Sequence, residues 1–323
     1  MECFLLGEYK ANKGPSNVNR SLIENSGGEI LCVKSNNKIL SILESFIQLA
    51  KCDKVVVSTV CAPRYYYFLR FLNKKYFYLM HGSLRFENEI NRLQLSKKKL
   101  DNEDAILRHA ERIICVSEGY AEWVKKRYPE YSDRITFVNN GVTIQPRKAV
   151  EKIPFTVAVA GGNRCIKNNL EVLKAVKLLH EQGIPCKLFV FGRKYPGNDP
   201  LEENEFCTYC GHLEKEQYYK KLDTISCFVM DSEVEPFGLV AADALNCHCS
   251  LLMTRNVGAR SIMKAEPCDF IENPHDVREV AEKIKHAWEW PNSERLCHSI
   301  DREGCSEKAT FVRLKKIIEG EIQ

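Results

Sequence analysis

The sequence contains no long apolar run. No stretch reaches the ~18 uncharged apolar residues that a membrane-spanning helix needs. The N-terminal segment, Met1-Glu2-Cys3-Phe4-Leu5-Leu6-Gly7, also lacks the basic start and the longer apolar core of a secretory signal. With 44% hydrophobic and 28% charged residues, the composition is that of a water-soluble globular protein. We therefore expect a cytoplasmic location.

Two common nucleotide-binding motifs are also absent. No G-x-G-x-x-G follows an expected strand, and Ala160-Gly-Gly-Asn163 lacks both the third glycine and the later acidic partner of a dinucleotide site. No G-x-x-x-x-G-K-[ST] occurs, which excludes a P-loop. These absences argue against a nicotinamide-dependent dehydrogenase and against a P-loop nucleotidase.

Cysteine is abundant, but its pattern does not indicate a disulfide framework. The fifteen cysteines are odd in number, and several lie inside apolar runs, where they behave as small buried hydrophobic residues. Cys32, Cys115 and Cys227 are examples. Cys207-x-x-Cys210-x-His212 and Cys247-His-Cys249 have no second ligand pair at zinc-ribbon spacing, so we predict no metal site.

The length of 323 residues fits two domains at ~150 residues per domain. Both halves alternate short β-branched or aromatic runs with helix-compatible stretches, which predicts two Rossmann-like, doubly wound α/β domains facing a cleft. We assign residues 1–143 to an N-terminal domain, 144–152 to a linker and 153–323 to a C-terminal domain whose last helix packs back on the first. The predicted strands are 55–60, 76–80, 112–117, 135–138, 155–160, 187–191, 226–230 and 250–253, and the predicted helices are 39–50, 118–127, 168–180, 215–222, 237–245 and 276–289.

Charge is distributed unevenly between the halves. Residues 1–150 carry a net charge of +8 and residues 151–323 a net charge of −4. The first half is therefore expected either to meet an anionic partner or to present a solvated basic surface. Residues 64–76 and 92–99 combine aromatic or apolar side chains with cations, so they could rest on an anionic membrane or a lipid diphosphate, unless the aromatics belong to the core. We predict no nucleic-acid partner.

The segment Glu235-Pro-Phe-Gly-Leu239 carries the most specific chemical signal. A strand is expected to end near Met230, and a helix is expected to begin at about Gly238 after an acidic loop. Free backbone N–H groups would then face the cleft at the positive end of a helix, with Glu235 before them and Asp243 more than a turn beyond. Such an arrangement could hold a polyol between amides and two carboxylates. The alternative is an ordinary capped helix.

At this point the sequence resembles a known family. Glu235-Pro-Phe-Gly-Leu-Val-Ala-Ala-Asp243 is similar to the E-x-F-G-x-x-x-x-E motif of retaining GT-B glycosyltransferases, the group 1 or family-four-like enzymes, with Asp in place of the second Glu. The resemblance implies that Glu235 and the amides of Phe237, Gly238 and Leu239 hold the hydroxyls of the donor sugar. It also implies that Asp243 binds the ribose of the nucleotide.

The expected strand 155–160 and the glycine turn after it resemble the start of the donor domain in the same family. Arg164 and Lys167 follow that turn and precede a helix. Two fixed cations there would neutralise the leaving nucleoside diphosphate. The alternative is a pair of surface charges. Because no Asp-x-Asp stands at a strand end, we expect a metal-independent enzyme with no cofactor other than the nucleotide-sugar co-substrate.

Further landmarks follow the order of the family. Gly14 stands where the family has a glycine-rich loop facing the diphosphate, and His81 stands at a strand end near the reacting face of the sugar. The backbone of His212 or Leu213 is expected beside the base. Residues 257–262 keep the family's turn but lack its Glu.

These resemblances imply a retaining hexosyl- or N-acetylhexosaminyltransferase. It would move a sugar from a UDP-sugar to a glycan or lipid-linked glycan in surface polysaccharide or glycoconjugate synthesis, at the inner face of the membrane. Two other readings stay open. One is a nucleotide-sugar epimerase or sugar phosphorylase on the same architecture. The other is a non-catalytic sugar-nucleotide-binding subunit of a partner enzyme.

Overall fold

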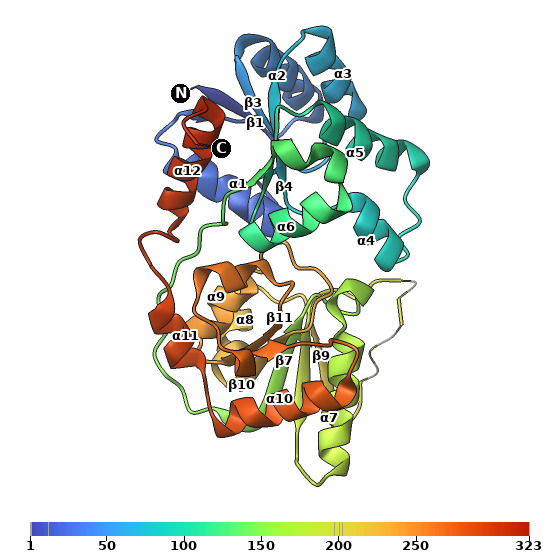
Figure 1. The fold of residues 1–323 in the computed structure, drawn as a ribbon, viewed down its shortest axis with the longest axis vertical. Coiled ribbons are helices and arrows are strands. Elements are labelled where there is room, and N and C mark those ends of the chain that lie inside the picture. Colours follow the sequence, from blue (N-terminus) through green and yellow to red (C-terminus); the bar gives the residue numbers. More distant parts are fainter. Residues whose placement is uncertain (1, 12, 197, 200, 202, 323) are drawn as a thin grey trace. The chain divides into compact units, whose positions relative to one another are not determined.

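The computed structural model describes residues 2–11, 13–196, 198–199, 201 and 203–322 (Figure 1). The chain divides into two compact units, each built on its own six-stranded sheet. The first unit comprises Met1–Phe86, Gln94–Val142 and Glu303–Gln323, and the second comprises Glu87–Leu93 and Thr143–Arg302. Residues 303–323, which the sequence analysis assigned to the C-terminal domain, thus group with the first unit.

The first unit is a parallel sheet in the order β2-β1-β3-β4-β5-β6. Its central strands are almost entirely apolar and buried, as expected where helices cover both faces. The chain order reverses direction between β1 and β3, which is where ligands bind in such sheets. The elements are β1 Cys3–Leu6, α1 Gly14–Asn25, β2 Ile30–Leu31, α2 Lys38–Lys51, β3 Lys54–Ser58, α3 Pro63–Phe71, β4 Tyr76–Met80, α5 Lys97–His109, β5 Arg112–Cys115, α6 Glu118–Arg127, the 3-10 helix η1 Pro129–Arg134, β6 Ile135–Phe137 and α12 Glu307–Glu319, while α4 Leu84–Ile90 begins in this unit and ends in the second.

The second unit is also a parallel sheet, in the order β12-β11-β10-β7-β8-β9. This is the strand order of a dinucleotide-binding Rossmann sheet, and its switch point lies between β7 and β10. The elements are β7 Ile153–Ala160, η2 Cys165–Lys167, α7 Asn169–Glu181, β8 Lys187–Phe191, β9 Cys207–Gly211, α8 Lys215–Asp223, β10 Ile225–Met230, α9 Val240–Asn246, β11 Ser250–Thr254, η3 Gly258–Ile262, η4 Pro267–Asp269, β12 Phe270–Ile271, α10 Val277–Glu289 and α11 Ser293–Ser299.

Local sequence determines where several helices begin. The side chain of Asn37 accepts hydrogen bonds from the first amides of α2, and Asp276 does the same for α10. Ser117 and Ser306 cap α6 and α12 with their hydroxyls. Gly320 ends α12 in the left-handed conformation, at φ 81°.

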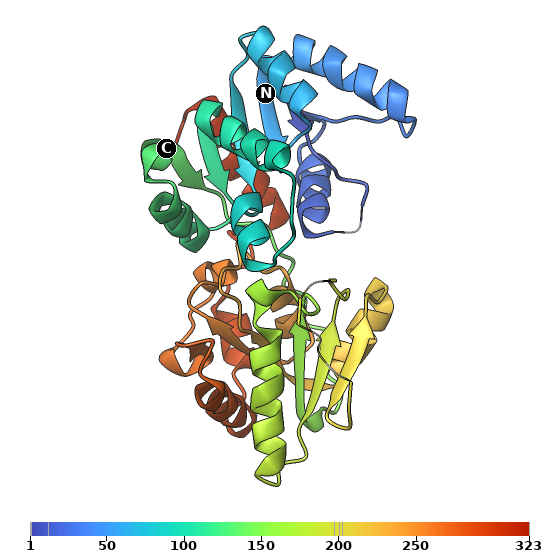
Figure 2. The same cartoon turned by 90° about the vertical axis from the view of Figure 1, so that its right-hand side faces the viewer.

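Helices α7 and α10 pack together over one face of the second sheet (Figure 2). Val157 and Val159 of β7 point into this layer, and Leu188 and Val190 of β8 join them. All four side chains are essentially inaccessible to solvent. This apolar layer holds β7 rigidly, so the loop that follows β7 starts from a fixed position.

Helix α12 lies beside α1 in the first unit (Figure 1). Lys315 of α12 pairs with Glu29, and the hydroxyl of Thr310 donates to the carbonyl of Asn139 over 2.9 Å. The predicted linker is not a free connection either. The amide of Gln145 and the carbonyl of Thr143 both bond to the side chain of Asn246 in the second unit.

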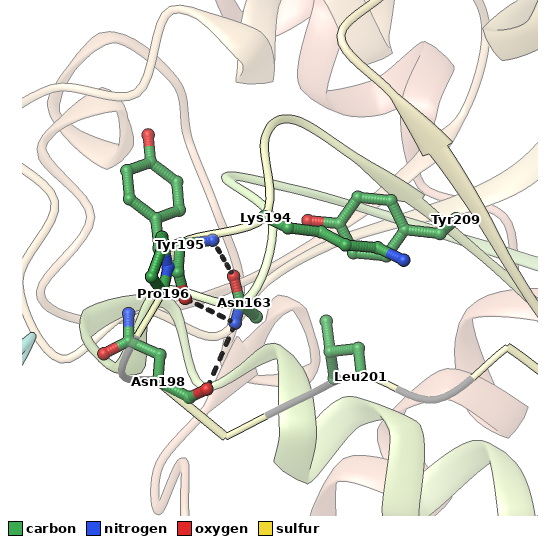
Figure 3. Close-up of a pocket in the computed structure, with 7 residues that line it drawn as sticks. All are labelled: Asn163, Lys194, Tyr195, Pro196, Asn198, Leu201 and Tyr209. Carbon is green, nitrogen blue, oxygen red and sulfur yellow. Dashed lines mark hydrogen bonds between the residues drawn. The ribbon is translucent and has the colours of Figure 1, made fainter.

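The second unit contains a cavity of about 270 Å³ at the carboxyl ends of β8 and β9 (Figure 3). The side chain of Asn163 organises one wall, because its Oδ1 accepts from the amide of Tyr195 while its Nδ2 donates to the carbonyl of the same residue. Lys194, Pro196, Asn198, Leu201 and Tyr209 complete the lining.

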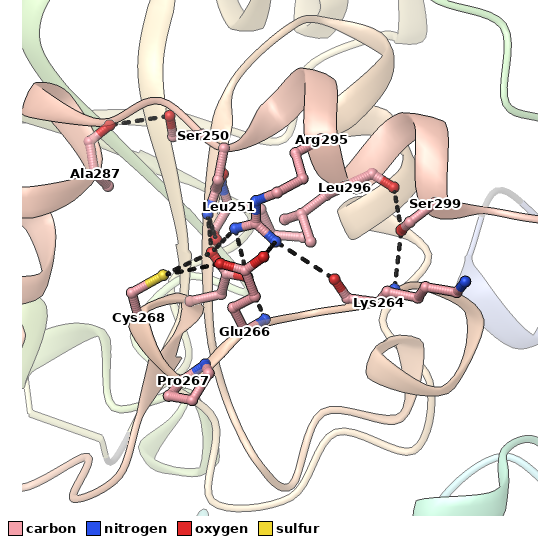
Figure 4. A network of polar contacts seen from close by, with 12 residues as sticks. Ser250, Leu251, Lys264, Glu266, Pro267, Cys268, Ala287, Arg295, Leu296 and Ser299 are labelled. Carbon is pink, nitrogen blue, oxygen red and sulfur yellow. Dashed lines mark hydrogen bonds and ion pairs between the residues drawn. The ribbon is translucent and has the colours of Figure 1, made fainter.

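Asp269 is the centre of a polar network that fastens α11 to the sheet. Figure 4 shows Arg295 and Leu251, two members of this network. Its side chain is 1% exposed, and both carboxylate oxygens accept from one guanidinium nitrogen of Arg295, at 2.7 and 2.9 Å. Asn292 donates to the same carboxylate and also bonds to the backbone of Leu251 in β11. The network therefore joins η4, α11 and β11.

Replacing Arg295 by Ala is expected to lower the free energy of unfolding by about 3 kcal/mol, because Asp269 would remain buried without its cation. The matched control is Arg255→Ala, since Arg255 pairs with Glu272 on the surface with both side chains about half exposed. That change should cost under ~1 kcal/mol. Urea unfolding followed by circular dichroism measures both, and equal losses would contradict the assigned difference.

The structure extends and corrects the predicted elements. Each predicted strand and helix is present within a few residues, except that the helix expected over 237–245 begins only at Val240. The reason is Gly238, whose φ of 93° is not helical. Strands β1, β2, β9 and β12 were not predicted. Among the described residues, no helix combines the length and apolar character that crossing a membrane requires.

All fifteen cysteines are free thiols. Cys115 and Cys227 are buried, as predicted from their apolar surroundings, whereas Cys32 is partly exposed.

Candidate functional site

The candidate site of the second unit lies at the switch point of its sheet. Residues 161–168 follow β7 and residues 231–239 follow β10, and these two strands are neighbours. The amide of Glu233 donates to the carbonyl of Ile166 over 2.9 Å, and the side chain of Asn168 donates to Glu233 over 2.8 Å. The two loops are therefore joined to each other.

The turn after β7 can be formed only by glycine. Gly161 and Gly162 have φ values of 100° and 64°. A Cβ on Gly162 would lie 1.9 Å from the carbonyl oxygen of Arg193, and a Cβ on Gly161 would lie 2.9 Å from Cγ of Lys167. Arg164 also packs over this turn, with its Nε donating to the carbonyl of Gly161 over 3.3 Å. The glycine turn thus brings the two predicted cations together.

Lys167 and Glu235 form an ion pair between the two loops. Their side chains are 13% and 15% exposed. Both residues are predicted from the sequence to belong to one site, and the structure brings them into contact. An ion pair so shielded from water is stronger than one on the surface.

The backbone of Glu235 is fixed by a third loop. Its amide donates to the carbonyl of Asn256 over 3.1 Å, and its carbonyl accepts from the amide of Gly258 over 2.9 Å. The carbonyl of Phe237 accepts from the amide of Ala259 over 2.6 Å. Residues 256–259, which follow β11, therefore hold the motif in place, a role that their sequence did not indicate.

The amides of Phe237, Gly238 and Leu239 remain available. Within the described part of the chain, no group accepts a hydrogen bond from them. Gly238 suits this position because its φ of 93° lies in a region that other residues rarely adopt. Helix α9 has only seven residues, so these amides matter as individual donors rather than as the end of a long helix.

Asp243 lies in the first turns of α9, and its carboxylate already has one partner. The hydroxyl of Tyr219 donates to its Oδ1 over 2.6 Å. Burial raises the pKa of Asp243, and this hydrogen bond opposes the rise. Tyr219 in turn stacks against the guanidinium of Arg147, 4.9 Å from the ring centre. Tyr219 lies outside every motif of the sequence, so its contact with Asp243 could not be predicted.

His212 and Leu213 follow β9 directly. The amide of Gly192 at the end of β8 donates to the carbonyl of Gly211 over 2.8 Å, so the ends of β8 and β9 meet here. The side chain of His212 is exposed, which leaves only its backbone suited to a fixed contact. The cavity of Figure 3 opens beside the same strand ends.

The segment Glu87–Leu93 also belongs to the second unit. The side chain of Asn91 accepts from the amide of Ile166 over 3.1 Å. Burial raises the pKa of Glu87, while the charges of Arg164 and Lys167 lower it, which places this carboxylate among the site's charges. Nothing in the sequence around Glu87 pointed to such a position.

In the first unit, His81 follows β4 and contacts Ser58 at the end of β3. Its Nε2 lies 2.9 Å from the hydroxyl of Ser58, and that hydroxyl donates to Oδ1 of Asn19 over 2.7 Å. Because the one proton of the hydroxyl is used by Asn19, His81 donates from Nε2 and leaves Nδ1 as an acceptor. Burial lowers the pKa of His81 to about 4, so the ring is neutral at physiological pH.

The structure corrects the expectation of a glycine-rich loop at 14–18. Gly14 is the first residue of α1, and Pro15 occupies the first turn, where its missing N–H is not needed. No side chain or backbone approaches the Cα of Gly14 closely enough to require glycine there. The described residues between β1 and α1 are instead 7–11 and 13.

Asp231 is a buried acid outside the predicted site. It directly follows β10, it is 0% exposed, and among the described residues neither carboxylate oxygen has a hydrogen-bond partner. Burial raises its pKa to about 9, and nearby Glu233, Glu171 and Glu279 add to the rise. The carboxyl group is therefore protonated at neutral pH.

This acid gives a prediction about pH and stability. The pKa of Asp231 in the folded state lies above the unfolded value of 3.8. The contribution of this group to the free energy of unfolding is therefore complete below about pH 4 and is lost as the pH rises towards 9. Asp231→Asn should therefore gain stability over the wild type across this window, by at least ~2 kcal/mol between pH 5 and pH 8. Urea unfolding at both pH values measures the gain. Glu205→Gln, whose side chain is 79% exposed, serves as control, and parallel pH profiles for wild type and Asp231→Asn would contradict the assignment.

Comparison with known proteins now places the second unit in a family. The family model of glycosyl transferases group 1 matches residues 144–304, which include the glycine turn, both cations, Glu235 and Asp243. This region of the chain therefore belongs to the group 1 glycosyltransferases. Comparison with curated proteins gives no match.

Solved glycosyltransferase structures share the fold of the whole chain. Alr3699/HepE from Anabaena, in complex with UDP and glucose, is 11% identical, with a TM-score of 0.67 over 99% of this chain and 100% of that chain. Sucrose-phosphate synthase from Thermosynechococcus elongatus is 16% identical, with a TM-score of 0.71 over 99% and 98%. The lipopolysaccharide outer core galactosyltransferase WaaB, in its apo form, is 14% identical, with a TM-score of 0.65 over 100% of both chains. The two predicted doubly wound units thus match the fold of GT-B glycosyltransferase structures.

Proposed function

We propose that this group 1 glycosyltransferase moves a hexose or N-acetylhexosamine from a UDP-sugar to a glycan or lipid-linked glycan, with retention of configuration. The observation that carries the proposal is the convergence of Arg164, Lys167 and Glu235 on the turn at Gly161. Opposite charges held at the switch point of a Rossmann sheet suit a ligand that combines a diphosphate with a polyol. The complexes of Alr3699/HepE with UDP and with UDP-glucose support a uridine donor.

Each residue of the cluster has a distinct role in this proposal. Lys167 and Arg164 bind the diphosphate and neutralise the charge that grows as it leaves. The carboxylate of Glu235 accepts hydrogen bonds from hydroxyls of the donor sugar, while the amides of residues 237–239 donate to them. Asp243 binds the ribose hydroxyls through the oxygen that Tyr219 does not occupy. The acceptor hydroxyl attacks on the face from which the diphosphate departs, so no covalent sugar intermediate on an enzyme carboxylate is required.

The remaining predicted residues take binding roles. The backbone at His212 and Leu213 contacts the base, and the neutral ring of His81 accepts a hydrogen bond from a sugar hydroxyl through Nδ1. Gly14 contributes only as the first residue of α1. We assign the acceptor to the basic first half of the chain and place the enzyme in surface polysaccharide or glycoconjugate synthesis, in the cytoplasm against the inner membrane face.

A panel of donors tests the proposal. UDP-glucose, UDP-galactose and UDP-N-acetylglucosamine are compared with GDP- and ADP-sugars by thermal shift, and released nucleoside diphosphate is then measured. At least one UDP-sugar should raise Tm and release UDP, in the absence of an acceptor by slow hydrolysis. Binding of a UDP-sugar without any turnover would favour the non-catalytic subunit, and conversion of the sugar without UDP release would favour an epimerase.

Activity should survive an excess of EDTA. Arg164 and Lys167 provide, at fixed positions, the positive charge that a divalent ion would otherwise supply to the diphosphate. Release of UDP in EDTA, with and without added magnesium or manganese, is the measurement. Complete loss in EDTA that either metal restores would contradict this part of the proposal.

A further inference from the structure

Helices α2 and α3 of the first unit expose an unusual number of large apolar side chains. Six of the fourteen exposed large hydrophobic residues in the described part of the chain lie on these two helices. The most exposed are Phe71 at 83%, Ile39 at 77% and Tyr67 at 67%. We call the six residues the α2–α3 apolar face: Ile39, Leu40, Leu43, Ile47, Tyr67 and Phe71.

These side chains gather on two neighbouring helices rather than at scattered positions. Ile39, Leu43 and Ile47 are spaced by four, which places them on one side of α2. The two helices pack against each other through Phe46, whose ring lies 5.5 Å from that of Tyr65 and 4.7 Å from that of Phe68. Figure 2 shows α2 in blue at the periphery of its unit. Large apolar side chains gathered in this way on neighbouring helices favour an interaction site.

The charges around this face have one predominant sign. Helices α2 and α3 carry four basic side chains, all exposed, and one acidic side chain. Within the described residues, none of the four cations forms an ion pair. The single acid, Glu44, is already engaged, because its two oxygens accept from the amides of Lys34 and Ser35. The four cations are Lys38, Lys51, Arg64 and Arg70.

The exposed apolar side chains and the cations together favour one kind of partner. A second copy of the chain would bring its own four cations close to the first four, and like charges repel each other. An anionic lipid surface offers an apolar layer for the exposed side chains and phosphates for the cations. The geometry also suits a flat surface: α2 is about 21 Å long at 1.5 Å per residue, with Lys38 at one end and Lys51 at the other, where long side chains reach back to the headgroups. Tyr67 and Phe71 add the aromatic side chains that favour the membrane interface.

We propose that the α2–α3 apolar face rests on the surface of an anionic phospholipid bilayer. Helix α2 lies parallel to the surface with Ile39, Leu43 and Ile47 among the headgroups, and the four cations contact lipid phosphates. The sequence predicts membrane contact at residues 64–76 and 92–99, so α2 is a new element of this surface. The inference deepens the proposed function by placing the enzyme where a lipid-linked acceptor lies, but membrane binding itself needs neither donor nor acceptor.

Sucrose-loaded vesicles test the inference with the full chain. The wild type should co-sediment with vesicles of phosphatidylcholine containing phosphatidylglycerol, and binding should weaken as salt is raised. Leu43→Ser combined with Phe71→Ser should reduce binding at least tenfold, as should Lys38→Gln combined with Arg64→Gln. Trp290→Ser is the control, because Trp290 is 70% exposed but belongs to the second unit, and this variant should bind like the wild type.

Several outcomes would overturn the inference. These are failure of the wild type to bind anionic vesicles, equal binding to pure phosphatidylcholine, and unchanged binding by the apolar double variant. A concentration-dependent dimer that this variant disperses, without vesicle binding, would show that a second copy covers the face. The thermal shift caused by the donor in the same variants separates the two proposals. Each variant should show the same shift as the wild type. If no form of the protein shows a shift, that result would count against the donor site and not against membrane binding.

Discussion

Glu235→Ala is expected to reduce sugar transfer by about 1,000-fold or more while leaving the protein folded. The carboxylate is the only group of its loop proposed to accept hydrogen bonds from the donor sugar, and its backbone is held from both sides by residues 256–258. Loss of one well-placed group at a reacting centre costs on the order of 100- to 1,000-fold. The loss of the ion pair with Lys167 adds to it, because the cation is then free to shift. Steady-state release of UDP measures the effect.

The control for this variant is Glu272→Ala, which removes a carboxylate of the same unit from an exposed ion pair with Arg255. It should keep wild-type activity. Circular dichroism and Tm of Glu235→Ala establish that the fold is intact, and Glu235→Gln separates charge from shape, since it keeps the size of the side chain. Turnover near that of the wild type in Glu235→Ala would remove the residue from the donor site.

The fold was largely predictable because its strongest signals are local. Strands such as 76–80 and 187–191 are continuous apolar runs, and helices such as 118–127 carry clear caps. The strands that were missed are short or mixed in character. β2 and β12 have two residues each, and β9 reads Cys-Thr-Tyr-Cys-Gly, a sequence with no apolar alternation. Their position depends on pairing with β1, β11 and β8, which no local pattern encodes.

The candidate site was also predictable only in part. Glu235 and Lys167 are 68 residues apart, and their contact could be expected only because their loops follow strands that were both assigned to one sheet. Tyr219 and Asn256 could not be found in this way, because they act through a hydroxyl and a backbone carbonyl that many residues could supply. Gly14 was assigned to a loop for a related reason. Gly followed by Pro is compatible both with a loop and with the first turn of a helix, and in the structure the pair begins α1.

The final prediction concerns Lys167 and Arg164, and it separates catalysis from binding. If the two cations neutralise charge that develops as the diphosphate leaves, they interact more strongly with the transition state than with the bound donor. Lys167→Ala and Arg164→Ala should then each lower kcat on the order of 100-fold, about 3 kcal/mol, rather than only raise KM. Lys174→Ala is the matched control, because Lys174 pairs with Glu171 on the surface of α7 with about half its side chain exposed.

Removing Lys167 also leaves Glu235 shielded without a partner, so a loss of stability must be told apart from a loss of catalysis. Combining Lys167→Met with Glu235→Gln removes both charges and should recover the Tm that Lys167→Met alone loses, but not kcat. Lys167→Arg should be partly tolerated, since a point charge is retained, whereas Arg164→Lys should cost more if the guanidinium contacts two phosphate oxygens at once. Recovery of kcat together with Tm in the double variant, or wild-type kcat with only a raised KM in both alanine variants, would reduce the two cations to structural or ground-state contacts.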